Sequence, residues 1–213
     1  MFRLFTLALV FFPVLYLSAQ ERSFQFWNQN KVEAELTTKT TLAFSQKIHY
    51  TPRNSRPDLK FADAFLMREV QNWLEFGGGY RLAKIDRDLD WLTEQRLMVV
   101  GNIFNDSDML EFNFSNRLER RIFNKAKNHF RHKQKLTVQF PKLASCNLRF
   151  WIAEETFEKF TTDNLHLVRF YGGLQLLVLQ KLQMNMYYIL EKYKHTENWN
   201  TRDILGLNLG INI

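Results

Sequence analysis

The sequence predicts an all-β fold, a closed antiparallel transmembrane β-barrel of about 10–12 strands. Apolar and polar residues alternate with a period of two over almost the whole chain after residue 23. The alternating runs are about ten residues long or longer, the length that a tilted membrane-spanning strand needs. The 20 Phe residues contribute to an aromatic content of 15%, and several aromatic residues stand near the ends of the runs, as in the girdles of membrane barrels.

Composition is typical of one folded domain. The chain has 213 residues, of which 46% are hydrophobic and 24% charged, so it is long enough for one domain and unlike a disordered segment. A single cysteine, Cys146, excludes an internal disulfide and any multi-cysteine metal site.

Residues 1–19 are expected to be a secretory signal peptide. Arg3 gives a positive start, the stretch from Leu4 to Leu17 is almost entirely apolar, and Ser18-Ala19 is a small-residue cleavage site. This stretch is shorter than the about 20 residues that span a bilayer as a helix. We therefore expect residues 20–213 to form the barrel, in the outer membrane of a Gram-negative-type envelope.

Each alternating run is interpreted as one strand. The clearest run places Leu110, Phe112 and Leu118 on one face, and Glu111 and Arg117 on the other. The runs from residue 129 onward repeat this pattern, and earlier runs have aromatic residues such as Trp27, Trp73 and Trp91 near their ends. In order, the expected strands are 24–36, 40–50, 61–70, 73–83, 91–104, 109–122, 129–140, 147–157, 165–178, 182–192 and 202–213.

The connections are expected to alternate between short periplasmic turns and longer outer loops. Because bacterial single-chain barrels have even strand numbers, eleven runs imply one wrong assignment. We expect twelve strands, with a short extra strand before Trp27. Ten is the alternative, if neighbouring runs merge at Thr37–Thr40 or at Gln71-Asn72, where the turns lack Gly and Pro.

A soluble β-sandwich or a lipocalin-like barrel is the other fold with this alternation, since its apolar faces point inward. Two features favour the membrane barrel. The polar faces have charges of both signs over many strands, as a wet interior would, and the apolar faces are long and rich in Phe.

The sequence resembles a family of bacterial outer-membrane barrels, domain-of-unknown-function family 2490. The resemblance covers nearly all of the chain after the signal peptide, and it implies a membrane barrel without implying an activity. The matching residues are Trp27, Leu36-Thr37-Thr38-Lys39, Phe76-Gly77-Gly78-Gly79-Tyr80-Arg81, Thr93-Glu94-Gln95-Arg96, Asn116-Arg117-Leu118-Glu119-Arg120-Arg121, Phe130-Arg131-His132-Lys133, Glu154-Glu155-Thr156-Phe157 and Arg169-Phe170-Tyr171-Gly172-Gly173.

Charged residues on the inward faces form the candidate functional cluster. They have mixed signs with cations in excess, which is consistent either with a barrel filled by ion pairs or with a narrow basic channel or pocket for small anionic solutes. The expected lumen-lining residues are Glu94, Arg96, Glu111, Arg117, Glu119, Arg121, Arg131, Lys133, Lys135, Arg149, Glu155 and Arg169.

Residue patterns for catalysis and metal binding are weak, so we predict that the protein is not an enzyme and has no cofactor. No Gly-x-Ser-x-Gly motif is present, and Ser115 with His132 is the single pair considered for a lipid hydrolase, although the two should face opposite sides. His129 and His132 should also diverge on a strand. The Gly77–Gly79 run lies within a strand and is not a phosphate-binding loop.

The expected partners are those of an exported barrel. The formal charge of +7 invites a nucleic-acid hypothesis, but the expected export and the scattered basic residues argue against it. Outer-membrane lipid and lipopolysaccharide should surround the barrel, the barrel-assembly machinery should insert it, and a small anionic solute could enter it.

Overall fold

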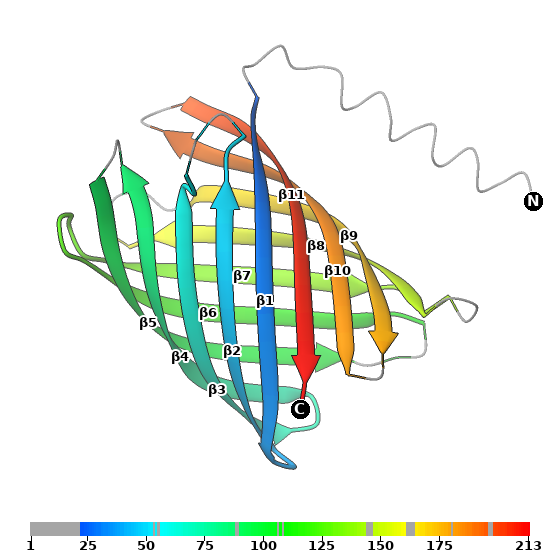
Figure 1. The fold of residues 1–213 in the computed structure, drawn as a ribbon. Coiled ribbons are helices and arrows are strands. Elements are labelled where there is room, and N and C mark those ends of the chain that lie inside the picture. The colour runs from blue at the N-terminus through cyan, green and yellow to red at the C-terminus, as the bar shows by residue number, and fades with distance from the viewer. Residues whose placement is uncertain are drawn as a thin grey trace, which may run out of the picture.

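Eleven β-strands form one closed barrel in the computed structural model (Figure 1). The structure describes residues 22–52, 54, 56–87, 90–105, 107, 109–143, 147–160, 165–179, 181–195 and 198–213. The signal peptide predicted over residues 1–19 and the turn at Cys146 lie outside them. The strands are β1 Ser23–Thr37, β2 Thr40–Tyr50, β3 Leu59–Gln71, β4 Leu74–Arg87, β5 Asp90–Asn105, β6 Glu111–Phe123, β7 His129–Gln139, β8 Leu148–Lys159, β9 Leu165–Leu179, β10 Leu182–His195 and β11 Asn198–Asn212.

The predicted all-β closed barrel is confirmed, and the described residues form eleven strands instead of the twelve we expected. Consecutive strands pair antiparallel, whereas β1 and β11 run side by side in the same direction (Figure 1). Their register runs from Ser23 opposite Arg202 to Glu33 opposite Asn212. A barrel with an odd number of strands can close only if one pair of neighbouring strands is parallel. The parallel ladder between β1 and β11 pairs the backbone groups of both strands, so no extra strand before Trp27 is needed.

The two ends of the barrel differ in their connections. We call the end at which β1 begins the loop end, and the end at which the chain finishes the turn end. At the turn end, β2 begins three residues after β1 finishes at Thr37, and β4 begins three residues after Gln71. These tight turns are where the sequence predicted short turns that lack Gly and Pro.

The predicted alternation of short and long connections is only partly correct. At the loop end, residues 51–58 form a long connection, but β5 begins three residues after Arg87 and β11 begins three residues after His195. At the turn end, residues 140–147 form a long connection. The strands continue through polar residues that the sequence reading placed in loops, because ladder hydrogen bonds are independent of side-chain polarity.

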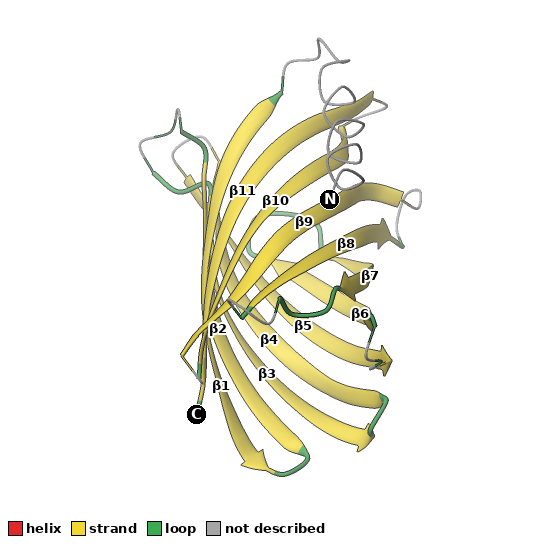
Figure 2. Ribbon diagram, turned by 90° about the vertical axis from the view of Figure 1, so that its right-hand side faces the viewer, coloured by secondary structure: helices red, strands yellow, loops and turns green. Residues whose placement is uncertain are grey.

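Alternation along each strand separates an apolar outer wall from a polar interior. Large hydrophobic side chains such as Phe44, Leu97 and Leu205 are about half exposed on the outer wall. A small apolar core of Trp27, Trp151, Ala153, Tyr187, Ile189 and Ile204 lies inside, among buried charged residues. Figure 2 shows the strands inclined and fanning around the barrel. Within the described part of the chain, no helix is long and apolar enough to cross a membrane.

Two inward-facing glycines let large aromatic rings lie close against the wall. A Cβ atom added to Gly206 would lie 2.1 Å from Cζ of Tyr187, and one added to Gly173 would lie 2.5 Å from the Trp151 ring. Their cross-strand neighbours are these same residues. Because each glycine has no side chain, the aromatic ring of its cross-strand neighbour can lie close against the inner wall of the barrel, as in other aromatic–glycine pairs of sheets.

Candidate functional site

The barrel encloses a cavity of about 600 Å³, lined by inward-facing residues of β1–β9 and by residues of β10 and β11. Ten basic and five acidic side chains line it, so its wall has more positive than negative groups. The basic residues are Lys31, Lys47, Arg81, Arg96, Arg117, Arg121, Arg131, Lys133, Lys135 and Arg169, and the acidic ones are Glu33, Asp63, Glu75, Glu94 and Glu155.

Most of the residues that we predicted to line the lumen contribute to this cavity. Glu94, Arg96, Arg117, Arg121, Arg131, Lys133, Lys135, Glu155 and Arg169 are among its lining residues. Glu119 is fully buried against several of them. Glu111 and Arg149 instead form a separate ion pair with each other near the turn end. Whether the cluster acts as a functional site stays a prediction.

One carboxylate joins two neighbouring strands in the interior. Glu94 on β5 is fully buried and accepts two hydrogen bonds of 2.7 Å from Arg121 on β6. Arg96, two residues further along β5, donates to it over 2.8 Å. Both carboxylate oxygens of Glu94 therefore accept hydrogen bonds, and a buried charge needs such partners in place of water.

A second carboxylate, Glu119, lies at the centre of three arginines. Its oxygens are 2.6 Å from Nη2 of Arg131, 2.8 Å from Nε of Arg117 and 3.2 Å from Nη1 of Arg96. These arginines come from β5, β6 and β7. Glu119 and Glu94 therefore hold three adjacent strands together across the interior, and they offset much of the local positive charge.

A third group of ion pairs spans β7 to β11. Glu155 accepts from Lys133, from Arg169 over 3.0 Å and from the Tyr171 hydroxyl over 2.5 Å. Arg169 also donates to Glu191 over 2.7 Å, and Glu191 is paired with Arg202. This chain of contacts links β7, β8, β9, β10 and β11 across the interior.

Two lysines in the cavity lack such a carboxylate partner. Within the described residues, Lys47 and Lys135 make neither a hydrogen bond nor an ion pair, and aromatic rings surround them instead. Nζ of Lys47 is 4.3 Å from the centre of the Trp27 ring, and Nζ of Lys135 is 4.5 Å from that of Tyr171. A cation–π contact leaves the ammonium N–H donors available to an anion.

The aromatic rings connect the two lysines into one site. Tyr171, Tyr187 and Trp151 form a cluster with ring centres about 6 Å apart. Lys47 also lies 5.9 Å from the Tyr187 ring, and Lys135 lies 5.6 Å from the Trp151 ring. Both ammonium groups therefore flank the same aromatic surface. We call Lys47, Lys135 and these rings with Trp27 the lysine–aromatic site.

Two further interior features were not predicted from the sequence. One is Lys47, and the other is the bidentate pair between Asp63 on β3 and Arg81 on β4, with oxygen–nitrogen distances of 2.5 and 2.6 Å. The signal was present, because Lys47 alternates with Ser45 and His49 on the inward face of β2. The predicted lumen-lining residues begin only at Glu94, so β2, β3 and β4 contributed none of them.

The interior is filled unevenly along the barrel axis. On β5, the inward residues from Leu92 to Val100 are buried, whereas Asn102, nearer the turn end, is only partly buried. On β1, Gln25 and Trp27 near the loop end are buried, and the inward residues further along are partly exposed. The ion pairs of Glu94 and Glu119 thus fill the loop half, and the cavity widens toward the turn end.

The considered hydrolase pair does not come together. Ser115 lines the cavity, whereas His132 lies opposite Leu118 and contacts Asn116 and Glu158 on the outer wall. Glu154 is exposed and Glu155 is buried, as two neighbouring residues of a strand should be. Within the described chain, no three His, Cys, Asp or Glu side chains are grouped to hold a metal ion.

Comparisons with known proteins identify a family and one solved structure. The family model for "Protein of unknown function (DUF2490)" matches residues 24–202, which confirms the resemblance seen in the sequence. No curated protein matches the chain. LpxR from Salmonella typhimurium is similar in structure, with 11% sequence identity and a TM-score of 0.46, over 80% of this chain and 83% of LpxR.

One prediction is withdrawn, namely that the chain is not an enzyme. That prediction relied on absent sequence motifs, whereas catalytic groups are recognised by their geometry and are brought together from separate segments of a chain. At this low identity, the similarity transfers no activity to the present chain.

Proposed function

The chain belongs to the DUF2490 family, and we propose that it is an outer-membrane β-barrel whose basic interior binds small anionic solutes. In this proposal, the apolar outer wall faces lipid and lipopolysaccharide, the barrel-assembly machinery inserts the chain, and residues 1–19 are removed during export. The turn end faces the periplasm, because three of its five connections are only two residues long and short connections lie on that side of outer-membrane barrels.

The observation that carries the proposal is the lysine–aromatic site. Lys47 and Lys135 line the interior cavity without a carboxylate in ion-pair contact, and a charge held in a confined interior without a partner is costly. An anion that enters the cavity would offset this cost by accepting hydrogen bonds from both ammonium groups. The excess of basic side chains around the cavity also attracts anions and repels cations.

The uneven filling of the interior favours a binding pocket over an open channel. An anion from the turn end reaches the lysine–aromatic site through the wider part of the cavity. To reach the loop end it would have to separate the ion pairs of Glu94 and Glu119, which are hydrogen-bonded and buried. We therefore expect slow or gated passage at most, with selectivity for anions.

Quenching of tryptophan fluorescence tests anion entry directly, because Trp27 belongs to the lysine–aromatic site. In a variant that retains only Trp27, with the other four tryptophans changed to Phe, iodide and caesium are compared as quenchers of the barrel in lipid vesicles. We expect stronger quenching by iodide than by caesium. Changing both Lys47 and Lys135 to Met should weaken this preference, because the two cations beside the Trp27 ring cluster are removed while eight other basic residues still line the cavity.

The matched control retains only Trp73, which is half exposed beside the turn between β3 and β4 and should be quenched without dependence on the two lysines. Equal quenching of Trp27 by both ions, a preference for caesium, or no quenching of Trp27 while Trp73 is quenched would each contradict the proposal.

A further inference from the structure

A cluster of polar residues interrupts the apolar outer wall on β6, β7 and β8. In the cross-strand ladder, Asn116 lies opposite Gln134, which lies opposite Thr156. One step toward the loop end, His132 lies opposite Glu158. We call these five residues, with Arg120 and Glu154 beside them, the outer polar patch. The inference below relies on the proposed membrane location and is independent of anion binding.

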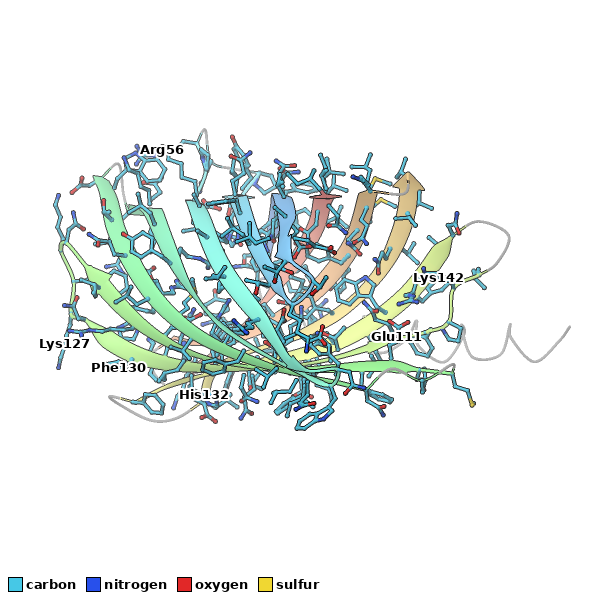
Figure 3. All side chains as sticks on the ribbon, turned by 90° about the horizontal axis from the view of Figure 1, so that it is seen from below. Arg56, Glu111, Lys127, Phe130, His132 and Lys142 are labelled. Atoms are coloured by element: carbon cyan, nitrogen blue, oxygen red, sulfur yellow. The ribbon has the colours of Figure 1, made fainter. Side chains whose placement is uncertain are left out.

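Apolar side chains border the outer polar patch on both sides along the strands. Phe130 and Phe160 lie toward the loop end, and Phe114, Leu136 and Ile152 lie toward the turn end. Phe130 and His132 lie on the outer side of the wall in Figure 3. Polar and charged groups that face lipid are unfavourable, so a surface of this kind requires a polar partner.

Contacts within the patch satisfy only some of its groups. The His132 ring nitrogens lie 3.2 Å from Oδ1 of Asn116 and 3.6 Å from Oε2 of Glu158. Glu158 nevertheless keeps 48% of its side chain exposed. Within the described residues, Arg120 makes no ion pair, and its guanidinium lies 5.8 Å from the Phe130 ring.

Arg120 and Glu158 have opposite charges and lie on either side of β7 near the loop end, in neighbouring outward-facing rows, because Arg120 lies opposite Phe130 and Glu158 lies opposite His132. Arg120 is three residues from the loop end of β6, and Glu158 is one residue from the loop end of β8. Both side chains are exposed on the outer wall. A two-fold axis along the membrane normal, placed between them, would bring each Arg120 to the Glu158 of a second copy, because such an axis preserves depth and exchanges the two sides.

We infer that the outer polar patch is the interface of a homodimer, in which Arg120 of each copy pairs with Glu158 of the other. The two equivalent ion pairs are removed from lipid and joined by the adjacent amide and imidazole groups. Low dielectric surroundings strengthen such pairs when they are hydrogen-bonded. The interface is isologous, so the assembly closes at two copies.

Charge reversal tests the dimer in the full mature chain. The association of labelled copies is measured in lipid vesicles by energy transfer, and the mass of the complex is measured in detergent by analytical ultracentrifugation. We expect a dimer for the unchanged chain, and a loss of at least about tenfold in association for Arg120→Glu or Glu158→Arg alone, as expected from removing an interfacial charge pair. The double variant that exchanges both charges should restore association.

Lys60→Glu is the matched control, because Lys60 is exposed on the outer wall at β3, three strands away from β6, and its reversal should leave association unchanged. A monomeric unchanged chain, single variants that associate normally, or an exchanged pair that fails to restore association would each overturn the inference. Each variant is first shown to float with the vesicles. A chain that fails to float would refute the proposed membrane location instead of the dimer.

Discussion

Removal of the negative charge of Glu119 should strongly destabilise the barrel. Glu119 is 0% exposed and contacts Arg96, Arg117 and Arg131 within 3.2 Å. In Glu119→Gln, three guanidinium groups lose their common carboxylate while they stay in the interior. Breaking a buried ion pair by removing one partner costs about 3–5 kcal/mol, because it leaves uncompensated charge. We expect a loss in this range in the free energy of unfolding.

The assay is equilibrium unfolding by urea of the barrel in lipid vesicles, followed by tryptophan fluorescence and by gel mobility without boiling. Glu111→Gln is the control, because Glu111 lies on the same strand and faces the same side, but its side chain is 37% exposed and pairs with Arg149 alone. An exposed pair contributes about 0–1 kcal/mol. A loss below about 1 kcal/mol for Glu119→Gln, or equal losses for both variants, would refute the view that interior ion pairs hold β5, β6 and β7 together.

Three further predictions concern glycine packing, closure and salt. Gly206→Ala should cost about 1–3 kcal/mol of unfolding free energy through overpacking against Tyr187, whereas Gly210→Ala, where an added Cβ meets no atom within 4 Å, should not; equal effects in urea unfolding would contradict this. Cysteines at Asn28 and Leu207, which are Cα partners in the parallel β1–β11 pair, should form an intrachain disulfide when the native cysteine is replaced by Ser, and a failure to cross-link would contradict the eleven-strand closure. Iodide quenching of Trp27 should weaken as the chloride concentration rises from about 0.1 to 1 M, because the Debye screening length shortens to about 3 Å and chloride competes with iodide for the site. Quenching that is independent of chloride would contradict a charged binding site.

The strands and their faces could be predicted from the sequence because both depend on local alternation. Leu110 to Leu118 shows this directly, since Phe112 and Leu118 face outward while Glu119 is buried inside. The period of two assigns each side chain to a face before any pairing is known. Loop boundaries were less predictable, because β4 continues through Asp86 and Arg87 as regular strand.

Ion-pair partners and barrel closure could not be predicted in the same way. Glu119 meets Arg131 through the register between β6 and β7, and it meets Arg96 through the register between β5 and β6. Register depends on the whole set of strands and turns, and a shift by one residue exchanges the two faces. The parallel β1–β11 pair uses backbone groups that every sequence possesses, so composition contains no signal for it.

Gel mobility and flotation of the refolded mature chain test whether it forms a closed barrel that faces lipid. An apolar outer wall around a charged interior predicts a barrel that floats with lipid vesicles and resists detergent until boiled, so that boiled and unboiled samples migrate differently. A chain that stays in plain buffer without lipid, with the same mobility before and after boiling, would contradict the account. Its charged residues would then have to lie on a solvated surface instead of in a lumen.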